Sequence, residues 1–213
     1  MKKLFMIILI FATAITTTAQ IDLSFGMGLD FNNVSSYRDY VNENFAPADN
    51  QISTFKSSVM FLSEVDYYLP DKFQIGLEYN LLIDSYNTPV GVAGIYEISY
   101  NVHRPSLLGY YVIYGKGYKF KFGVGAGPRF ASLTEKIVTQ TNYNSTGLGF
   151  LLKAEGHTAL STNFYAVIGV DARYDLVGEP SYSNGKIHNN VNGENLNLNS
   201  ISVGLKLGIS LTF

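Results

Sequence analysis

The sequence predicts an all-β fold: an eight-stranded antiparallel up-and-down transmembrane β-barrel with short periplasmic turns and long extracellular loops. Apolar and polar residues alternate with a period of two in eight segments, which is the side-chain period of a β-strand. Most segments are about ten residues or longer, more than a strand of a soluble sheet usually has and enough to cross a bilayer. One face of each segment is mainly apolar, whereas the other collects glycines and charged side chains.

The composition of the chain argues against nucleic-acid binding and against sites built from cysteine. The chain has 213 residues, a formal net charge of −2 and only 15% charged residues, below the roughly 25% usual in soluble domains. Because there is no basic excess, we expect no nucleic-acid partner. The sequence contains no Cys, which excludes disulfides and thiolate metal sites.

The first 19 residues predict a cleavable signal peptide. Lys2 and Lys3 form a positive start, and residues 4–14 form an apolar run too short for a comfortable transmembrane helix. Small residues precede the expected cleavage site before Gln20. Residues 20–213 then form one outer-membrane β-barrel domain, and the expected location is the cell outer membrane.

The predicted elements follow the alternation in chain order. Residues 201–213 give the clearest strand, since every second residue from Ile201 to Phe213 is apolar and the others are small, polar or charged. The eight predicted strands are residues 21–31, 55–69, 73–83, 94–114, 118–133, 147–157, 164–174 and 201–213. Short turns are expected at 70–72, 115–117 and 159–163, and long loops at 32–51, 84–93, 134–145 and 176–194.

The loop at 32–51 contains a predicted helix. Apolar residues recur at helical spacing from Val34 to Phe45, which indicates a short amphipathic helix. Ser35 or Ser36 is the expected N-cap, because a hydroxyl there can accept a hydrogen bond from a free N–H of the first turn.

The fourth strand is the least regular one. Its alternation is lost beyond Arg104 and Pro105. Proline in a strand belongs at an edge or a bulge, and a closed barrel has no edge. We therefore expect a bulge near Pro105, which would turn Arg104 away from lipid.

The polar face is expected to point into the barrel. An eight-stranded barrel is just filled by side chains, and glycines suit a crowded interior. Buried charges must be paired, so these residues predict a salt-bridged plug that holds the barrel rigid. The predicted members of this lumen charge network are Glu64, Asp66, Glu78, Lys121, Arg129, Lys153, Glu155, Asp171, Arg173 and Lys206. Asp22 and Glu97 are expected on the same face.

Two alternatives to a plugged membrane barrel stay open. The lumen charges could instead line a narrow proton or ion route. A soluble lipocalin-like barrel would place the apolar face inward. Aromatic residues near strand ends favour the membrane barrel, because they match two interfacial girdles. The girdle at the short turns is predicted to contain Tyr67, Phe73, Tyr110, Tyr114, Tyr118, Phe164 and Phe213, and the girdle towards the long loops Phe31, Tyr79, Tyr96, Phe130 and Tyr174.

No motif predicts an enzyme, a cofactor or a metal site. His103, His157 and His188 lack the short spacing of a metal set. The glycines in residues 123–127 superficially resemble a dinucleotide loop, but no helix follows them. Residues 190–195 are rich in Asn and Gly but depart from the EF-hand spacing, so a plain turn is expected there.

The chain resembles the PorT-like family of bacterial outer-membrane β-barrel domains. The resemblance lies in residues 104–108 leading into Tyr110-Tyr111, in residues 121–128, and in the closing strand that ends at Phe213. Arg104 stands where the family usually has an apolar residue. The resemblance implies an outer-membrane location and insertion by the barrel-assembly machinery, with Phe213 as the assembly signal. Some members are implicated in protein secretion, and no catalytic residues carry over.

The expected function is a structural or interaction role through the extracellular loops 32–51 and 176–194, with a secretion accessory as one version. The expected partners are outer-membrane lipid, the barrel-assembly machinery and a protein bound at those loops. The alternative is a small porin or channel for ions or small solutes.

Overall fold

The computed structural model describes residues 20–90, 94–183 and 185–213. The predicted signal peptide, residues 1–19, lies outside the described residues. Within the described ranges, no helix is both long and apolar enough to span a membrane.

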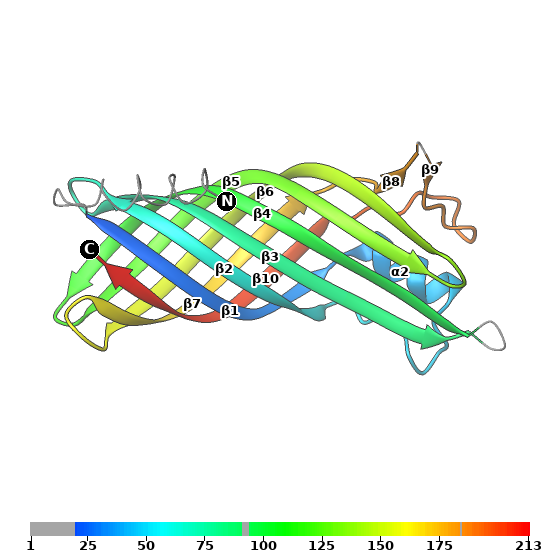
Figure 1. Ribbon diagram of the computed structural model, residues 1–213, viewed down its shortest axis with the longest axis horizontal. Coiled ribbons are helices and arrows are strands. Elements are labelled where there is room, and N and C mark those ends of the chain that lie inside the picture. Colours follow the sequence, from blue (N-terminus) through cyan, green and yellow to red (C-terminus); the bar gives the residue numbers. More distant parts are fainter. Residues whose placement is uncertain (1–19, 91–93, 184) are drawn as a thin grey trace, which may run out of the picture.

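Eight antiparallel strands close into a barrel (Figure 1). They are β1 (Ile21–Asn33), β2 (Lys56–Tyr68), β3 (Phe73–Pro89), β4 (Ile95–Gly115), β5 (Tyr118–Lys136), β6 (Gln140–Ala159), β7 (Phe164–Leu176) and β10 (Ser200–Thr212). Each of β1 to β6 pairs with the next strand of this series, β7 pairs with β10, and β10 pairs with β1 to close the sheet. The predicted fold class, an eight-stranded antiparallel up-and-down barrel, is confirmed.

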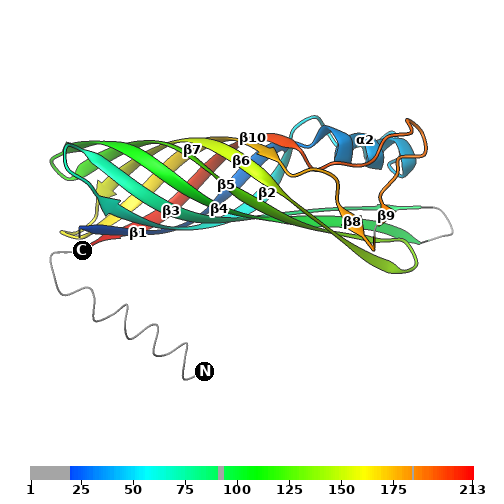
Figure 2. The same ribbon diagram turned by 90° about the horizontal axis from the view of Figure 1, so that it is seen from above.

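The two ends of the barrel differ. Residue 21 and the C-terminal residue lie at one end together with the short turns, and we name this the turn end. The other end, named the loop end, carries α2 (Ser35–Asn44) and the short strands β8 (Ser181–Tyr182) and β9 (Gly185–Lys186), as Figure 2 shows. At the turn end, Asp71 and Lys72 both have positive φ values, of 60° and 70°, which suits a tight turn between antiparallel strands.

The predicted helix is present, but its N-cap is Val34 and no side chain caps it. The prediction of Ser35 or Ser36 as N-cap was wrong. Ser35 is already the first helical residue. The Ser36 hydroxyl instead accepts a hydrogen bond from the Asn197 N–H at 3.0 Å, so it joins the helix to the segment before β10.

Four strands continue well beyond the rest of the barrel. β3, β4, β5 and β6 rise past the other strands at the loop end, so the loops expected at 84–93 and 134–145 are largely strand. Residues 91–93 lie outside the described residues. We name the raised part of these four strands the tall wall. Its inner face is apolar and packs against α2, so its strands bury side chains there.

The predicted bulge near Pro105 was wrong. β3 and β4 keep one register from the Phe73–Tyr111 pair to the Pro89–Ile95 pair. Arg104 is 1% exposed and points into the lumen through ordinary alternation. The loss of pattern in the sequence has another cause: both faces of β4 near the turn end are apolar or aromatic.

The apolar face of the barrel points outward, as expected. Leu205, Leu207 and Leu152 are 50%, 65% and 63% exposed, whereas Lys153 and Arg173 are 4% and 2% exposed. Three predicted placements were wrong. Tyr96 and Tyr110 are buried inside instead of lying in the girdles. Glu97 faces outward, where it pairs with Lys136 at 3.2 Å.

Candidate functional site

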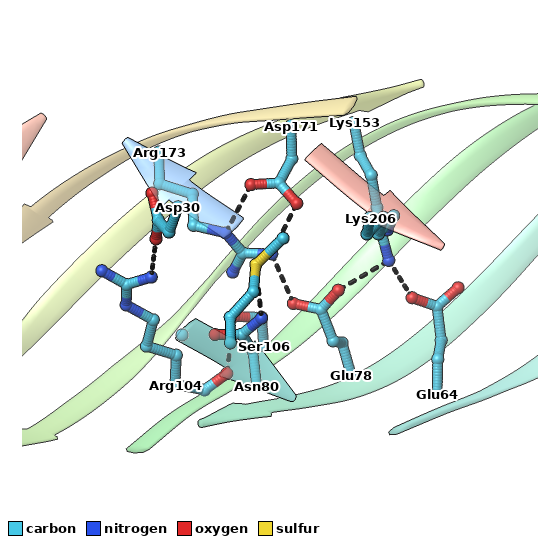
Figure 3. Close-up of polar contacts among 12 residues, drawn as sticks. Asp30, Glu64, Glu78, Asn80, Arg104, Ser106, Lys153, Asp171, Arg173 and Lys206 are labelled. Carbon is cyan, nitrogen blue, oxygen red and sulfur yellow. Dashed lines mark hydrogen bonds and ion pairs between the residues drawn. The ribbon is translucent and has the colours of Figure 1, made fainter. Parts of the chain in front are cut away.

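The lumen holds nine of the ten predicted network residues in one connected cluster. At its centre, Lys153 lies 2.6 Å from Glu78 and 3.2 Å from Glu155, and it also contacts Glu64. Glu78 is shared with Arg173 at 2.9 Å, and Arg173 reaches Asp171 at 2.8 Å. Figure 3 shows Glu78 bridging the lysine and the arginine.

The same cluster extends towards the turn end. Lys121 lies 3.3 Å from Glu64 and also contacts Asp66. Lys206 lies 2.5 Å from Glu155. These charges come from six different strands, and several of the ion pairs tie together strands that are not neighbours in the sheet. The arrangement can lock the barrel shape, because every carboxylate in it faces at least one cation.

Arg129, the tenth predicted residue, belongs to a separate cluster at the loop end. It lies 2.5 Å from Asp175, and Arg104 lies 2.9 Å from the same carboxylate and 2.5 Å from Asp30. The sequence prediction left Asp30, Arg104 and Asp175 out of the network. Asp30 and Asp175 lie on the polar face that alternation predicts for their strands. Arg104 shares its face with Tyr96, which was predicted to face lipid, so alternation alone does not place it in the lumen.

Another lysine, also missed, closes the turn end. Lys119 lies 2.5 Å from Asp22 and donates a hydrogen bond to the Tyr68 hydroxyl at 3.0 Å. Thr212 donates to the other oxygen of Asp22 at 2.5 Å. The ammonium group also lies over the ring of Tyr165, 4.8 Å from its centroid, a cation–π contact.

Tyr110 is buried inside the barrel. Its hydroxyl donates to Glu64 at 2.8 Å, and Lys121 lies 4.2 Å from its ring centroid. The ring needs the glycines around it, since a Cβ on Gly123 would lie 2.4 Å from a ring carbon. Glycine in this strand therefore makes room for a close-packed plug.

The loop end is covered by a cap, which we define as α2 together with residues 187–198. Val41 of α2 is fully buried, the Phe45 ring stacks on Tyr96 with centroids 3.7 Å apart, and Tyr37 meets Tyr100 edge-on at 5.2 Å. Leu196 and Leu198 belong to the same apolar cluster. The cap thus closes the mouth that the tall wall partly surrounds.

Polar contacts fix the cap in place. The Tyr40 hydroxyl donates to Glu135 of β5 at 2.6 Å, and Tyr96 donates to the same oxygen at 2.9 Å. Burial raises the pKa of Tyr40, and its hydrogen bond to the Glu135 carboxylate raises it further, so the phenol stays protonated as a donor. Asn189 joins the two parts of the cap by donating to Glu43 at 2.7 Å.

The three histidines lie apart from one another. His103 is on the outer face of β4, His157 is buried in the lumen 3.2 Å from Glu155, and His188 lies in the loop before β10. Across residues 20–90, 94–183 and 185–213, no group of three or more His, Asp or Glu side chains could hold a metal ion.

Comparisons with known proteins identify the fold. No family model matches the chain, and no curated protein matches it. Similar solved structures include neisserial surface protein A, with a TM-score of 0.57 and 10% identity over 91% of this chain and 97% of that one. Ail, the attachment invasion locus protein of Yersinia pestis, has a TM-score of 0.54 and 11% identity over 92% and 100% of the two chains.

A major outer membrane protein from Thermus thermophilus is also similar, with a TM-score of 0.56 and 13% identity over 91% of this chain and 99% of that one. At such low identity these likenesses show the fold alone, which is that of the eight-stranded outer-membrane barrels. The resemblance to the PorT-like family stays a prediction.

Proposed function

We propose that this chain is an outer-membrane protein with a closed barrel, which acts as a rigid support for an interaction surface at its loop end. In this proposal, residues 1–19 direct export, the barrel-assembly machinery inserts the domain with Phe213 as the terminal aromatic signal, and the loop end is extracellular. A secretion accessory is one version of this role. The barrel fold and its apolar outer face support the membrane location.

One observation carries the proposal: the lumen is filled by paired charges and the mouth is covered by a packed cap. Breaking a buried ion pair is costly. A solute could pass through this lumen only if several of these ion pairs were broken. This argues against the alternative, a small porin. The cap has its own apolar cluster, and the loop end exposes Val191 (64%) and Tyr182 (58%) to solvent, as a surface for a partner requires.

Site-specific photo-cross-linking in the native membrane tests the interaction role. A cross-linking amino acid at Val191 samples the cap, and one at Leu160, which is 62% exposed at the turn end, is the matched control. The proposal expects a discrete cross-linked partner from Val191 that is not seen from Leu160. Cross-links from Leu160 alone, or from neither position, would contradict it. Fractionation tests the location, and recovery as a soluble periplasmic protein would overturn it.

A further inference from the structure

The outer face of β3, β4, β5 and β6 changes from apolar to polar within a few residues. The register of β3, β4, β5 and β6 aligns their outward residues in rows across the four strands. The row Leu77, Leu107, Ala126, Phe150 is wholly apolar. The second outward row beyond it, towards the loop end, consists of Leu81, His103, Phe130 and Thr146. The next two rows are Ile83, Asn101, Ser132, Asn144 and then Ser85, Ser99, Thr134, Asn142.

This change locates the membrane boundary on these four strands. Lipid tails tolerate the apolar rows but not a band of Asn, Ser and Thr side chains, which need water or headgroups as hydrogen-bond partners. Tyr79 and Phe130, 43% and 46% exposed, lie at this level, where aromatic side chains favour the interface. On β4 itself the change falls between Leu107 and Asn101, so His103 lies in the headgroup layer, an inference that rests on the proposed membrane location.

His103 is well placed to meet a lipid headgroup. Its ring lies on the outer surface beside Tyr79, and the Tyr79 hydroxyl is 2.5 Å from Nδ1. A tyrosine hydroxyl that donates to Nδ1 leaves the hydrogen of a neutral imidazole on Nε2. That N–H is then a donor on the side of the ring away from Tyr79, and the hydrogen bond holds the ring in one orientation.

We propose that His103 and Tyr79 form a binding site for a lipid phosphate in the headgroup layer. Nε2–H of His103 donates to a phosphate oxygen, and Tyr79 positions the ring. Hydrogen-bond chemistry favours this ligand, because the Nε2–H of a neutral imidazole is a donor and a phosphate oxygen is a charged acceptor. Lys136 also faces outward, but it is already paired with Glu97. Glu97 lies six residues closer to the loop end of β4 than His103, about 20 Å from it.

Nitrogen–phosphorus dipolar dephasing in solid-state NMR tests the site. The chain has three histidines, so labelling histidine with ¹⁵N in the ring gives three imidazoles in the full-length folded protein. In bilayers of phosphatidylethanolamine and phosphatidylglycerol, we expect the Nε2 signal of His103 to be dephased by lipid ³¹P. The His157 signal, from the lumen, should not be dephased.

Three variants make the result specific. His103→Gln should abolish the dephased signal, whereas His188→Gln should leave it unchanged. Tyr79→Phe keeps the ring but removes the hydroxyl, and it should weaken the dephasing at His103 if Tyr79 positions the imidazole. Undiminished dephasing in Tyr79→Phe would refute the positioning role of Tyr79.

The outcome separates this inference from the proposed function. A barrel that inserts into the bilayer but shows no dephasing at His103 overturns the phosphate site and leaves the membrane location intact. A chain that fails to insert at all contradicts the membrane location itself, and insertion is checked first by the heat-modifiable migration of the folded barrel.

Discussion

Replacing Glu78 by Gln should strongly destabilise the barrel. The Glu78 carboxylate is fully buried, and it lies 2.6 Å from the Lys153 ammonium and 2.9 Å from the Arg173 guanidinium. Gln has nearly the same shape but no charge: its carbonyl oxygen can accept from only one of the two cations, and its NH₂ would present donors to the other. Removing one partner of a buried ion pair costs about 3–5 kcal/mol, and Glu78→Gln weakens two such pairs at once, since Lys153 and Arg173 each lose a carboxylate.

Glu97→Gln is the matched control. Glu97 also pairs with a lysine, Lys136, at 3.2 Å, but both side chains are about half exposed on the tall wall. Such a surface pair contributes about 0–1 kcal/mol. The assay is reversible urea unfolding of each variant in lipid vesicles, followed by the heat-modifiable shift, with the free energy of unfolding compared with that of the natural chain.

The Glu78 variant should therefore lose several kcal/mol more than the Glu97 variant. Equal costs, or a loss below about 1 kcal/mol for Glu78→Gln, would refute the argument that the lumen network holds the barrel together. A parallel measurement in 1 M salt sharpens the contrast. Salt screens the exposed pair but reaches the buried one poorly, so only the small effect of Glu97→Gln should shrink.

Four further predictions test other parts of the structure. Leu205→Arg places a charge on the lipid face near mid-strand and should cost about 2–4 kcal/mol; normal folding of that variant in vesicles would count against the outward orientation. Gly123→Ala drives a Cβ against the Tyr110 ring and should cost about 1–3 kcal/mol in urea unfolding, whereas Gly109→Ala meets no atom within 4 Å and should be near neutral. Tyr40→Phe removes a hydrogen bond to a carboxylate, worth about 1.5–3 kcal/mol, so amide exchange in α2 should speed up while exchange in β1 stays unchanged. Phe213→Ala should lower the yield of assembled barrel in cells but not refolding into vesicles, and equal yields in cells would remove Phe213 as an assembly signal.

The sequence was sufficient to predict the barrel and the direction of its charges. Alternation with period two fixes which residues share a face, and in β10 and β7 this placed Lys206, Asp171 and Arg173 in the lumen. The same rule places Asp30 and Asp175 on the lumen side as well, near the loop ends of β1 and β7, although neither was named in the predicted network.

The tall wall and its cap could not be predicted in the same way. In β4 the apolar residues Tyr96 and Ile98 point inward, because at the loop end the inner face of the tall wall packs against α2. Apolar residues therefore change from the outer face to the inner face along one strand. A rule that equates apolar with lipid-facing fails at that point, which explains the errors at Tyr96 and Glu97.

Single-channel recording in planar bilayers tests the closed barrel most directly. The folded full-length protein should insert, as shown by heat-modifiable migration, and should give no steady conductance over a wide voltage range. Tyr110→Ala provides the positive comparison, because removing this buried ring, which contacts Glu64 and Lys121, should open space in the lumen and produce measurable openings. A steady open conductance from the natural chain would contradict the closed barrel and favour the small-channel alternative.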